Sequence, residues 1–292
     1  MSQLFKGAGV ALITPFNKNF SIDYEALGEV VENQLSNGMD YLVALGTTAE
    51  TPALTKNEKQ NVVRLIVEKA AGKAPVVVGM GGNDTRAVIK NTKNSDLSGI
   101  DGLLIVTPYY NKPSQEGLYR HYKAISEESP LPINLYNVPS RTGVNMEAET
   151  TIRLADECKN IIAVKEASGI LSQFATIEKY TSDDFLLISG DDVLALPIIS
   201  IGGKGIISVI ANAFPGKLSS LVHAALDGDF SLSVKYHMEL LDIMKLIFRE
   251  GSPGGIKALM NSLGMIENVL RLPLAPVSKE LYSEIEMAAK LI

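Results

Sequence analysis

A lysine stands at the end of an apolar run in the stretch Ile161 to Gly169, which reads IIAVKEASG. The aliphatic run is typical of a strand that is buried on both faces, and Lys165 falls at the carboxyl end of that strand. Burial among apolar neighbours penalises an ammonium group and favours the neutral amine. A neutral lysine amine is a nucleophile that attacks ketones and forms a Schiff base. From its position alone, Lys165 is equally well interpreted as an exposed lysine at the start of a loop.

Hydroxyl groups that complement a Schiff-base lysine follow other apolar runs. Tyr136 ends the run before that of Lys165, where it could carry protons to and from a carbinolamine, and Thr48 and Tyr110 could extend this relay. Backbone N–H groups around Thr47 and Thr48 offer a site for a carboxylate, so the set suits a 2-oxo acid. Taken singly, the tyrosines are also typical of a core or an interface, and the threonines of a helix cap.

Two further residues follow apolar runs and have both a functional and an ordinary interpretation. Arg141, five residues after Tyr136, either binds a substrate or pairs with a surface carboxylate. Gly190 either approaches a ligand or only serves the backbone geometry of a turn. Complementary groups at the ends of neighbouring strands are improbable as independent accidents, and their coincidence favours an active site.

Eight short runs rich in Val, Ile and Leu alternate with helix-like segments, which predicts βα units and a parallel sheet. They span residues 9–16, 41–50, 75–83, 102–110, 133–141, 161–168, 185–192 and 205–212. Eight such units predict an α/β fold of the (β/α)8 TIM-barrel type, whose site lies at the carboxyl ends of the strands. Strand alternation places Lys165 on the same face as Ile161 and Ala163, and Glu166 on the opposite face.

The pattern becomes wholly helical towards the end of the chain. Tyr236, Leu240, Met244 and Phe248 are four residues apart and predict one apolar helix face. We therefore expect a barrel catalytic domain over residues 1–224 and a C-terminal helical domain over residues 225–292. Lys204 precedes the eighth run and belongs at the amino end of the barrel, which argues against it as the nucleophile.

The composition excludes several classes of protein. The 292 residues are 46% hydrophobic, and 27 Lys and Arg against 33 Asp and Glu give a net charge of −6, which argues against nucleic acid as a partner. No apolar run reaches the roughly twenty residues of a membrane span. The chain has one cysteine, Cys158, and histidines without metal-ligand spacing at His121, His223 and His237. We expect a cytoplasmic protein without a metal, a cofactor or a membrane partner.

Six motifs carry a resemblance that extends over the whole chain. They are GTTAET, TPYYNKPSQEGLYRHY, LYNVPSRTG, KEASG, SGDD and GIISVIAN. In order and spacing they closely resemble the dihydrodipicolinate synthases, also called 4-hydroxy-tetrahydrodipicolinate synthases. The resemblance implies a lyase that condenses pyruvate with L-aspartate 4-semialdehyde on the route to diaminopimelate and lysine, and a homotetramer of TIM barrels.

The resemblance also implies a role for each matching residue. Lys165 would form the pyruvate Schiff base, and Tyr136 would relay protons together with Thr48 and with Tyr110, which reaches into a neighbouring subunit's site. The remaining positions would bind substrate: the pyruvate carboxylate at Thr47 and Thr48, the semialdehyde carboxylate at Arg141, and the backbone contacts at Gly190 and Ile207.

Departures from the family pattern occur in two places. Ala49 and Thr51 stand where the family usually has glycine and serine, and Ala49 would cost about 1 kcal/mol if its φ were positive. At the positions associated with feedback inhibition, Lys59 and Ala87 replace a histidine and a glutamate beside the matching Asn83. We therefore expect an enzyme nearly insensitive to lysine, unless a nearby carboxylate compensates.

Related activities remain as alternatives. The sialic acid lyases and the keto-deoxy sugar acid aldolases share the lysine and the tyrosine, but the motif around Arg141 favours a synthase. A binding barrel without catalytic activity would be expected to have lost Lys165 or Tyr136, and both are present.

Overall fold

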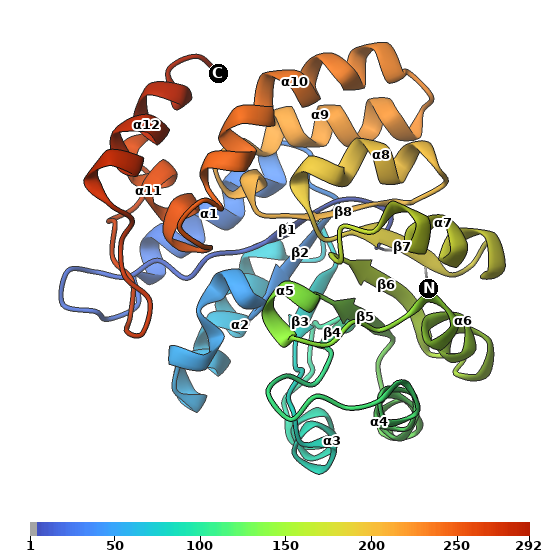
Figure 1. Cartoon of the computed structure of the whole chain (residues 1–292). Coiled ribbons are helices and arrows are strands. Elements are labelled where there is room, and N and C mark those ends of the chain that lie inside the picture. The colour runs from blue at the N-terminus through green and yellow to red at the C-terminus, as the bar shows by residue number, and fades with distance from the viewer. Residues whose placement is uncertain (1–4) are drawn as a thin grey trace.

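The computed structural model describes residues 5–292, and its eight strands close into one parallel barrel (Figure 1). The strands are β1 (Gly7–Ala11), β2 (Tyr41–Ala44), β3 (Val76–Gly79), β4 (Gly102–Val106), β5 (Ile133–Asn137), β6 (Ile161–Glu166), β7 (Leu186–Ser189) and β8 (Gly205–Ser208). Each strand pairs with the next along the chain, and β8 pairs with β1 through Gly205 and Gly7. The predicted TIM barrel is confirmed.

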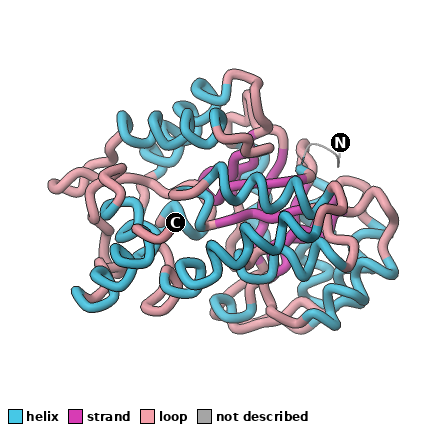
Figure 2. Tube along the Cα trace, turned by 90° about the horizontal axis from the view of Figure 1, so that it is seen from above, coloured by secondary structure: helices cyan, strands magenta, loops and turns pink. Residues whose placement is uncertain are grey.

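Helices pack around the outside of the strands (Figure 2). The outer ring consists of α1 (Tyr24–Ser36), α2 (Lys56–Ala70), α3 (Thr85–Asn94), α4 (Gln115–Glu128), α6 (Ala148–Glu157), α7 (Leu171–Tyr180), α8 (Ala195–Ser200) and α9 (Pro215–Leu226). Short helical turns follow four strands: η2 (Thr47–Ala49) and η3 (Thr51–Ala53), α5 (Pro139–Thr142), η4 (Asp192–Leu194) and η5 (Ile210–Asn212). These turns occupy the carboxyl ends of the strands, where a barrel of this kind carries its site.

Local sequence explains where the helices begin. In α2, the Thr55 hydroxyl accepts from the backbone N–H of Glu58, and the Glu58 carboxylate accepts from the N–H of Thr55. This reciprocal capping box satisfies two backbone donors that a helix start leaves without partners. Asp23 caps α1 and Ser114 caps α4 through their side-chain oxygens. The sequence therefore specifies these boundaries locally.

The core consists of an outer layer between strands and helices and an inner layer inside the barrel. In β2, Tyr41 and Val43 belong to the inner layer, and Leu42 and Ala44 belong to the outer layer. The inner layer also contains Tyr136, together with Ala11, Val77, Leu104, Ala163, Leu186, Ile188 and Ile207. The alternation expected of strands therefore holds around the barrel.

The prediction that Ile161 shares a face with Lys165 is wrong. Ile161 belongs to the outer layer, and its neighbour Ile162 packs against the inner one. The cause is a shift in the register of β5 and β6, because Ile133 pairs with Ile161 and Asn134 pairs with Ala163. The extra residue reverses the alternation before Ala163, and beyond it Lys165 faces inward as predicted.

The C-terminal helices α10 (Phe230–Leu246), α11 (Gly254–Ser262) and α12 (Lys279–Ala289) pack beside the barrel, as Figure 1 shows. Leu240 and Met244 are buried on α10, whereas Phe248 is 38% exposed beyond its end. Helix α10 lies against α9 and α12. The helical extension is confirmed, and a domain boundary at residues 224 and 225 stays a prediction.

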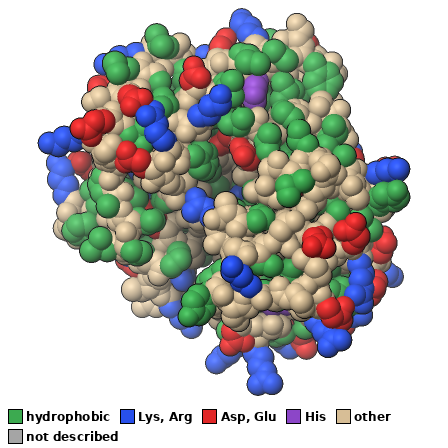
Figure 3. All heavy atoms as spheres, in the orientation of Figure 1, with side chains coloured by type: hydrophobic (Ala, Val, Ile, Leu, Met, Phe, Trp, Pro, Cys, Tyr) green, Lys and Arg blue, Asp and Glu red, His purple; other side chains and the backbone are tan. Residues whose placement is uncertain are grey.

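The surface carries both signs of charge. Figure 3 shows acidic and basic side chains mixed over one face of the molecule, with a hollow near its centre. Within residues 5–292, no helix combines the length and the apolar composition that crossing a membrane requires.

Closure of the barrel depends on a glycine in β8. Gly205 has φ +148°, and a Cβ built on it would lie 2.0 Å from the backbone oxygen of Gly7 in β1. We expect Gly205→Ala to lower the free energy of unfolding in urea well beyond the roughly 1 kcal/mol of a Cβ at positive φ, because β8 must move away from β1. Gly228→Ala is the matched control, since its φ is +84° and its Cβ would meet nothing within 4 Å. Equal losses in both variants would contradict this account of barrel closure.

Candidate active site

Lys165 lies inside the mouth of the barrel, at the carboxyl end of β6. Its side chain is only 4% exposed, and its Nζ lies 4.3 Å from the ring centroid of Tyr136. The register of the sheet pairs Tyr136 directly with Lys165. Lys204 and Lys257 form ion pairs with carboxylates, but no ion pair holds Lys165 within the described part of the chain. The interpretation of Lys165 as an exposed loop lysine is therefore wrong.

Gly190 provides the space that the Lys165 side chain occupies. A Cβ built on Gly190 would lie 2.8 Å from Cβ of Ala167 and 3.1 Å from both Cγ and Cε of Lys165. The Gly190 N–H donates to the backbone oxygen of Glu166, at 2.7 Å. A Cβ at this position would clash with Ala167 and crowd the stem of Lys165, so Gly190 has a steric role in addition to any backbone contact with a ligand.

The opposite face of β6 carries a buried carboxylate, Glu166, which is 0% exposed. Its oxygens accept from Nδ2 of Asn137, at 3.1 Å each, from Nε2 of Gln173 and from the N–H of Ser168, both at 2.8 Å. Burial raises the pKa of Glu166, although these hydrogen bonds oppose the rise. Asn137 follows Tyr136 in the chain, and Glu166 follows Lys165. This hydrogen-bond network therefore fixes the ends of β5 and β6 from the outer face of the sheet.

The loop after β2 forms the turn η2, in which Thr47 is exposed and Thr48 is 4% exposed. Ala49 belongs to this turn and is not among the residues with positive φ, so its Cβ causes no strain. The Thr51 hydroxyl donates to the backbone oxygen of Gly46, at 2.8 Å, and closes the loop. Both departures from the family pattern are therefore compatible with the loop.

Tyr110 lies at the surface of the chain. Its side chain is 90% exposed and its φ is +70°, a backbone conformation that few residues other than glycine adopt. A side chain this exposed has little contact with its own chain. A single chain therefore brings together Lys165, Tyr136 and Gly190, but it leaves Tyr110 at the surface.

The remaining predicted residues lie around the same end of the barrel. Arg141 is exposed on α5, and its Nη2 donates to the backbone oxygen of Ser252, at 3.3 Å, in the segment before α11. Ile207 is fully buried in the inner layer on β8.

Lys204 lies at the opposite, amino end of the barrel. It forms an ion pair with Glu178, and its backbone oxygen accepts from the N–H of Gly7 at the start of β1, which confirms the predicted position.

Asp192 is a second buried carboxylate, and its structural role is not predicted by the sequence pattern. Asp192, in the SGDD motif, is 1% exposed and accepts from the Ser208 hydroxyl and from the backbone N–H groups of Val209 and Ile210. It thus joins the end of β7 to the end of β8. Burial raises the pKa of Asp192 to about 6, although its hydrogen bonds oppose the rise.

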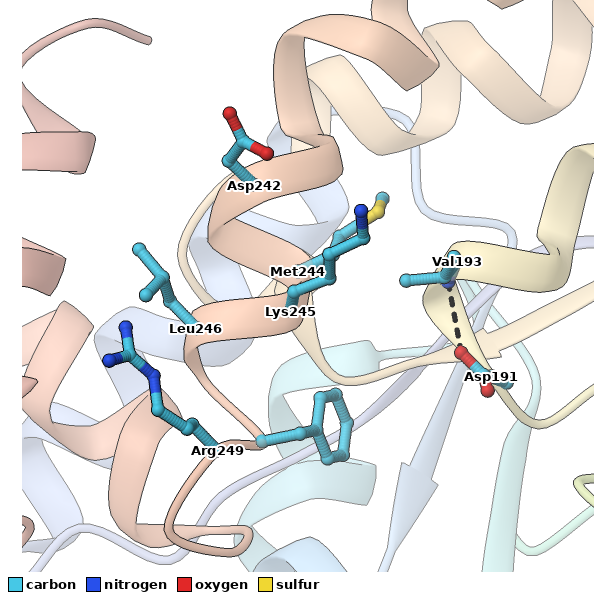
Figure 4. A pocket seen from close by; sticks show the side chains of 8 residues that line it. Asp191, Val193, Asp242, Met244, Lys245, Leu246 and Arg249 are labelled. Atoms are coloured by element: carbon cyan, nitrogen blue, oxygen red, sulfur yellow. Dashed lines mark hydrogen bonds between the residues drawn. The ribbon is translucent and has the colours of Figure 1, made fainter.

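A hollow of about 690 Å³ begins next to the site, at Asp191. It continues along the end of α10 past Asp242, Leu246 and Arg249. Figure 4 shows these three side chains pointing away from Asp191, whose carboxylate accepts from the N–H of Val193 at 3.0 Å. Asp242 and Arg249 therefore do not converge with Asp191 on a common ligand. Across residues 5–292, no group of three or more His, Cys, Asp or Glu side chains is placed to hold a metal ion.

Asn83 and Asp84, in the segment linked to lysine feedback, make hydrogen bonds within the chain. The Asn83 amide donates to the backbone oxygen of Tyr109, at 3.2 Å. Asp84, a carboxylate that could replace the missing glutamate, accepts from the N–H groups of Arg86 and Ala87 and caps α3. The expected insensitivity to lysine stays a prediction.

Comparison with known proteins identifies the family. A family model described as the dihydrodipicolinate synthetase family matches residues 4–292. The chain belongs to this family. It is 54% identical to the 4-hydroxy-tetrahydrodipicolinate synthase of Phocaeicola vulgatus over 271 residues, which cover 93% of this chain and 91% of the relative.

Solved structures of the dihydrodipicolinate synthetase family share the fold. The dihydrodipicolinate synthase of Aquifex aeolicus is 42% identical with a TM-score of 0.94, covering 98% of this chain and 97% of its own. A structure described as the first monomeric dihydrodipicolinate synthase variant is 41% identical with a TM-score of 0.95, covering 100% of this chain and 99% of its own.

The raised pKa of Asp192 predicts a pH dependence of stability. Between about pH 4 and 6 the folded chain retains a proton on Asp192 that the unfolded chain releases, so this group's contribution to stability is complete below pH 4 and is lost as the pH rises through 6. At about 1.4 kcal/mol per pKa unit, the loss approaches roughly 3 kcal/mol. We expect Asp192→Asn to remove this loss, because an amide keeps the shape of the group and does not ionise.

Urea denaturation of both chains between pH 4 and 7 measures the effect, with Asp183→Asn as a charge-matched control at an exposed position in the loop before β7. The stability difference between Asp192→Asn and the parent chain should shift in favour of the variant as the pH rises. The control should remain within about 0.5 kcal/mol of the parent throughout. A difference that does not change with pH would contradict the prediction.

Proposed function

We propose that this chain is a Schiff-base lyase, a 4-hydroxy-tetrahydrodipicolinate synthase that condenses pyruvate with L-aspartate 4-semialdehyde. The observation that carries the proposal is the buried Lys165 amine, which has no carboxylate partner in the described chain and lies against Tyr136. Membership of the dihydrodipicolinate synthetase family supports it. An amine held in this way is available for covalent chemistry.

The first step follows from the position of the amine. Nζ of Lys165 attacks the ketone carbon of pyruvate, and the resulting carbinolamine loses its hydroxyl as water after receiving a proton. Tyr136, beside Nζ, supplies and removes the protons, and Thr48 and Tyr110 complete the relay. The imine then loses a methyl proton to give an enamine, whose carbon attacks the aldehyde of the second substrate.

Two carboxylates need separate binding groups. The turn at Thr47 and Thr48 offers backbone N–H donors and hydroxyls to the pyruvate carboxylate. The backbone of Gly190 and Ile207 contacts the substrate from the ends of the neighbouring strands β7 and β8. Arg141 binds the carboxylate of the semialdehyde. Its guanidinium is exposed and makes no ion pair within residues 5–292, so its charge is available to an incoming anion.

The alternatives receive less support. In a sialic acid lyase the second substrate is a sugar, which offers a cation at position 141 no carboxylate to bind. A binding barrel without catalytic activity has no need for an amine and a phenol placed together inside its mouth.

We further propose a homotetramer in which Tyr110 enters a neighbouring subunit's site. An aromatic side chain that is 90% exposed, on a strained backbone, is the kind of group that an interface covers. One of the structural relatives is described as a monomeric variant.

Reductive trapping tests the nucleophile. We expect pyruvate with borohydride to attach to Lys165, because reduction converts the imine into a stable secondary amine, and peptide mass spectrometry locates the adduct. Lys165→Met should abolish labelling. An adduct on Lys204, or none in the parent chain, would refute the proposed mechanism.

Subunit complementation tests the place of Tyr110. Tyr110→Phe and Lys165→Ala chains, each with little activity alone, should regain activity when they are refolded together, because some mixed sites then contain both intact groups. The initial rate of mixtures, with hybrid assembly verified by differently tagged chains, is the measurement. Verified hybrids without recovery would place Tyr110 outside the neighbouring site.

A further inference from the structure

A fully buried ion pair joins the C-terminal helices to the loop after β2. Lys257 on α11 donates from Nζ to the carboxylate of Glu50, and both side chains are 0% exposed. The same Nζ donates to the backbone oxygen of Val269, at 3.0 Å, and lies 4.1 Å from the ring centroid of Phe16. The chemistry described above uses neither charge.

Glu50 directly follows the turn that contains Thr47 and Thr48. Its φ of +54° is unfavourable for a residue with a side chain, and its N–H donates to the backbone oxygen of Thr47, at 3.2 Å. Its second carboxylate oxygen accepts from the N–H of Arg271, at 3.0 Å. The strained residue that ends the turn is therefore anchored by two donors from the C-terminal part of the chain.

A second set of contacts surrounds this pair. The Arg271 guanidinium binds both carboxylate oxygens of Glu58, at 2.6 and 2.9 Å, and donates to the backbone oxygen of Ala53, at 3.0 Å. Glu58 completes the capping box of α2 and Ala53 lies in η3, so the attachment extends along the whole segment from η2 to α2. Helix α11 itself packs against η5, after β8.

Stability alone does not account for a charge pair at this position. Removing two charges from water is so costly that an apolar pair of similar volume often stabilises a protein equally well or better. Burial lowers the pKa of Lys257 to about 8, although the Glu50 carboxylate opposes the shift. The contacts of the ion pair are directional, whereas those of an apolar pair are not. They hold the Glu50 carboxylate and the strained backbone of Glu50 in one arrangement.

We propose that the Glu50–Lys257 ion pair positions the Thr47–Thr48 turn for the carboxylate of the 2-oxo acid, so that the C-terminal helices take part in pyruvate binding. This inference rests on the proposed function. Glu50 and Lys257 are positioning residues, because they act through the turn and do not touch the substrate.

The test separates positioning from stability by replacing the whole pair. Lys257→Met alone leaves a buried carboxylate without its cation and should lower the urea midpoint sharply. Glu50→Met combined with Lys257→Met should recover most of that midpoint. We expect the double variant to have a KM for pyruvate raised at least about tenfold, with a smaller change in kcat and in the KM for the semialdehyde.

Two further variants complete the design. Glu50→Gln keeps the shape of the side chain and removes its charge, so it should fold and raise the pyruvate KM in the same direction. Lys217→Met with Glu239→Met removes a partly exposed ion pair whose atoms lie 2.7 Å apart between α9 and α10, and should leave all three constants unchanged.

The outcomes distinguish the two proposals. A parent chain that traps no pyruvate would overturn the proposed function and this inference with it. A parent chain that traps pyruvate, with an unchanged pyruvate KM in the folded double variant or in Glu50→Gln, would overturn the inference alone and leave the ion pair a purely structural element.

Discussion

The structure depends on holding an amine inside the mouth of the barrel without neutralising it by a carboxylate. The inner face of β6 places Lys165 beside Tyr136, and the absence of a Cβ at Gly190 leaves room for the stem of the lysine. The outer face anchors the same strand through Glu166, which accepts from the Asn137 amide of β5. The carboxylate nearest in sequence to the amine is thus directed away from it, behind the sheet, where it fixes the strand.

The parts of the chain that surround this amine come from its whole length. Asp192 ties the end of β7 to that of β8, and the Glu50–Lys257 pair ties the loop after β2 to α11. These are buried polar contacts, which are costly unless every group finds a partner. Their concentration at the carboxyl end of the barrel contrasts with the apolar inner layer below it and is consistent with the rigid support that a catalytic constellation requires.

Sequence reasoning located the strands and the polar residues at their ends, because both depend on short-range patterns. Each of the eight aliphatic runs overlaps one strand. Lys165, Tyr136 and Gly190 lie together because the carboxyl ends of neighbouring strands meet at one end of the barrel. The prediction for Ile161 was wrong because a one-residue register shift cannot be recognised in an aliphatic run, in which every residue is suited to the inner or the outer layer. The backbone strain considered for Ala49 is absent, because the positive φ falls one residue later, on Glu50.

The barrel, the family and the lysine at the end of the sixth strand can be predicted from the order of the residues alone, because periodicity and motif spacing are properties of neighbouring residues. The burial of Lys165, the exposure of Tyr110 in a single chain and the contact between Lys257 and Glu50, which are 207 positions apart, are seen only in the folded chain. Burial and ion pairing depend on how distant segments pack, and the free energy of a charge depends on the surroundings that this packing creates.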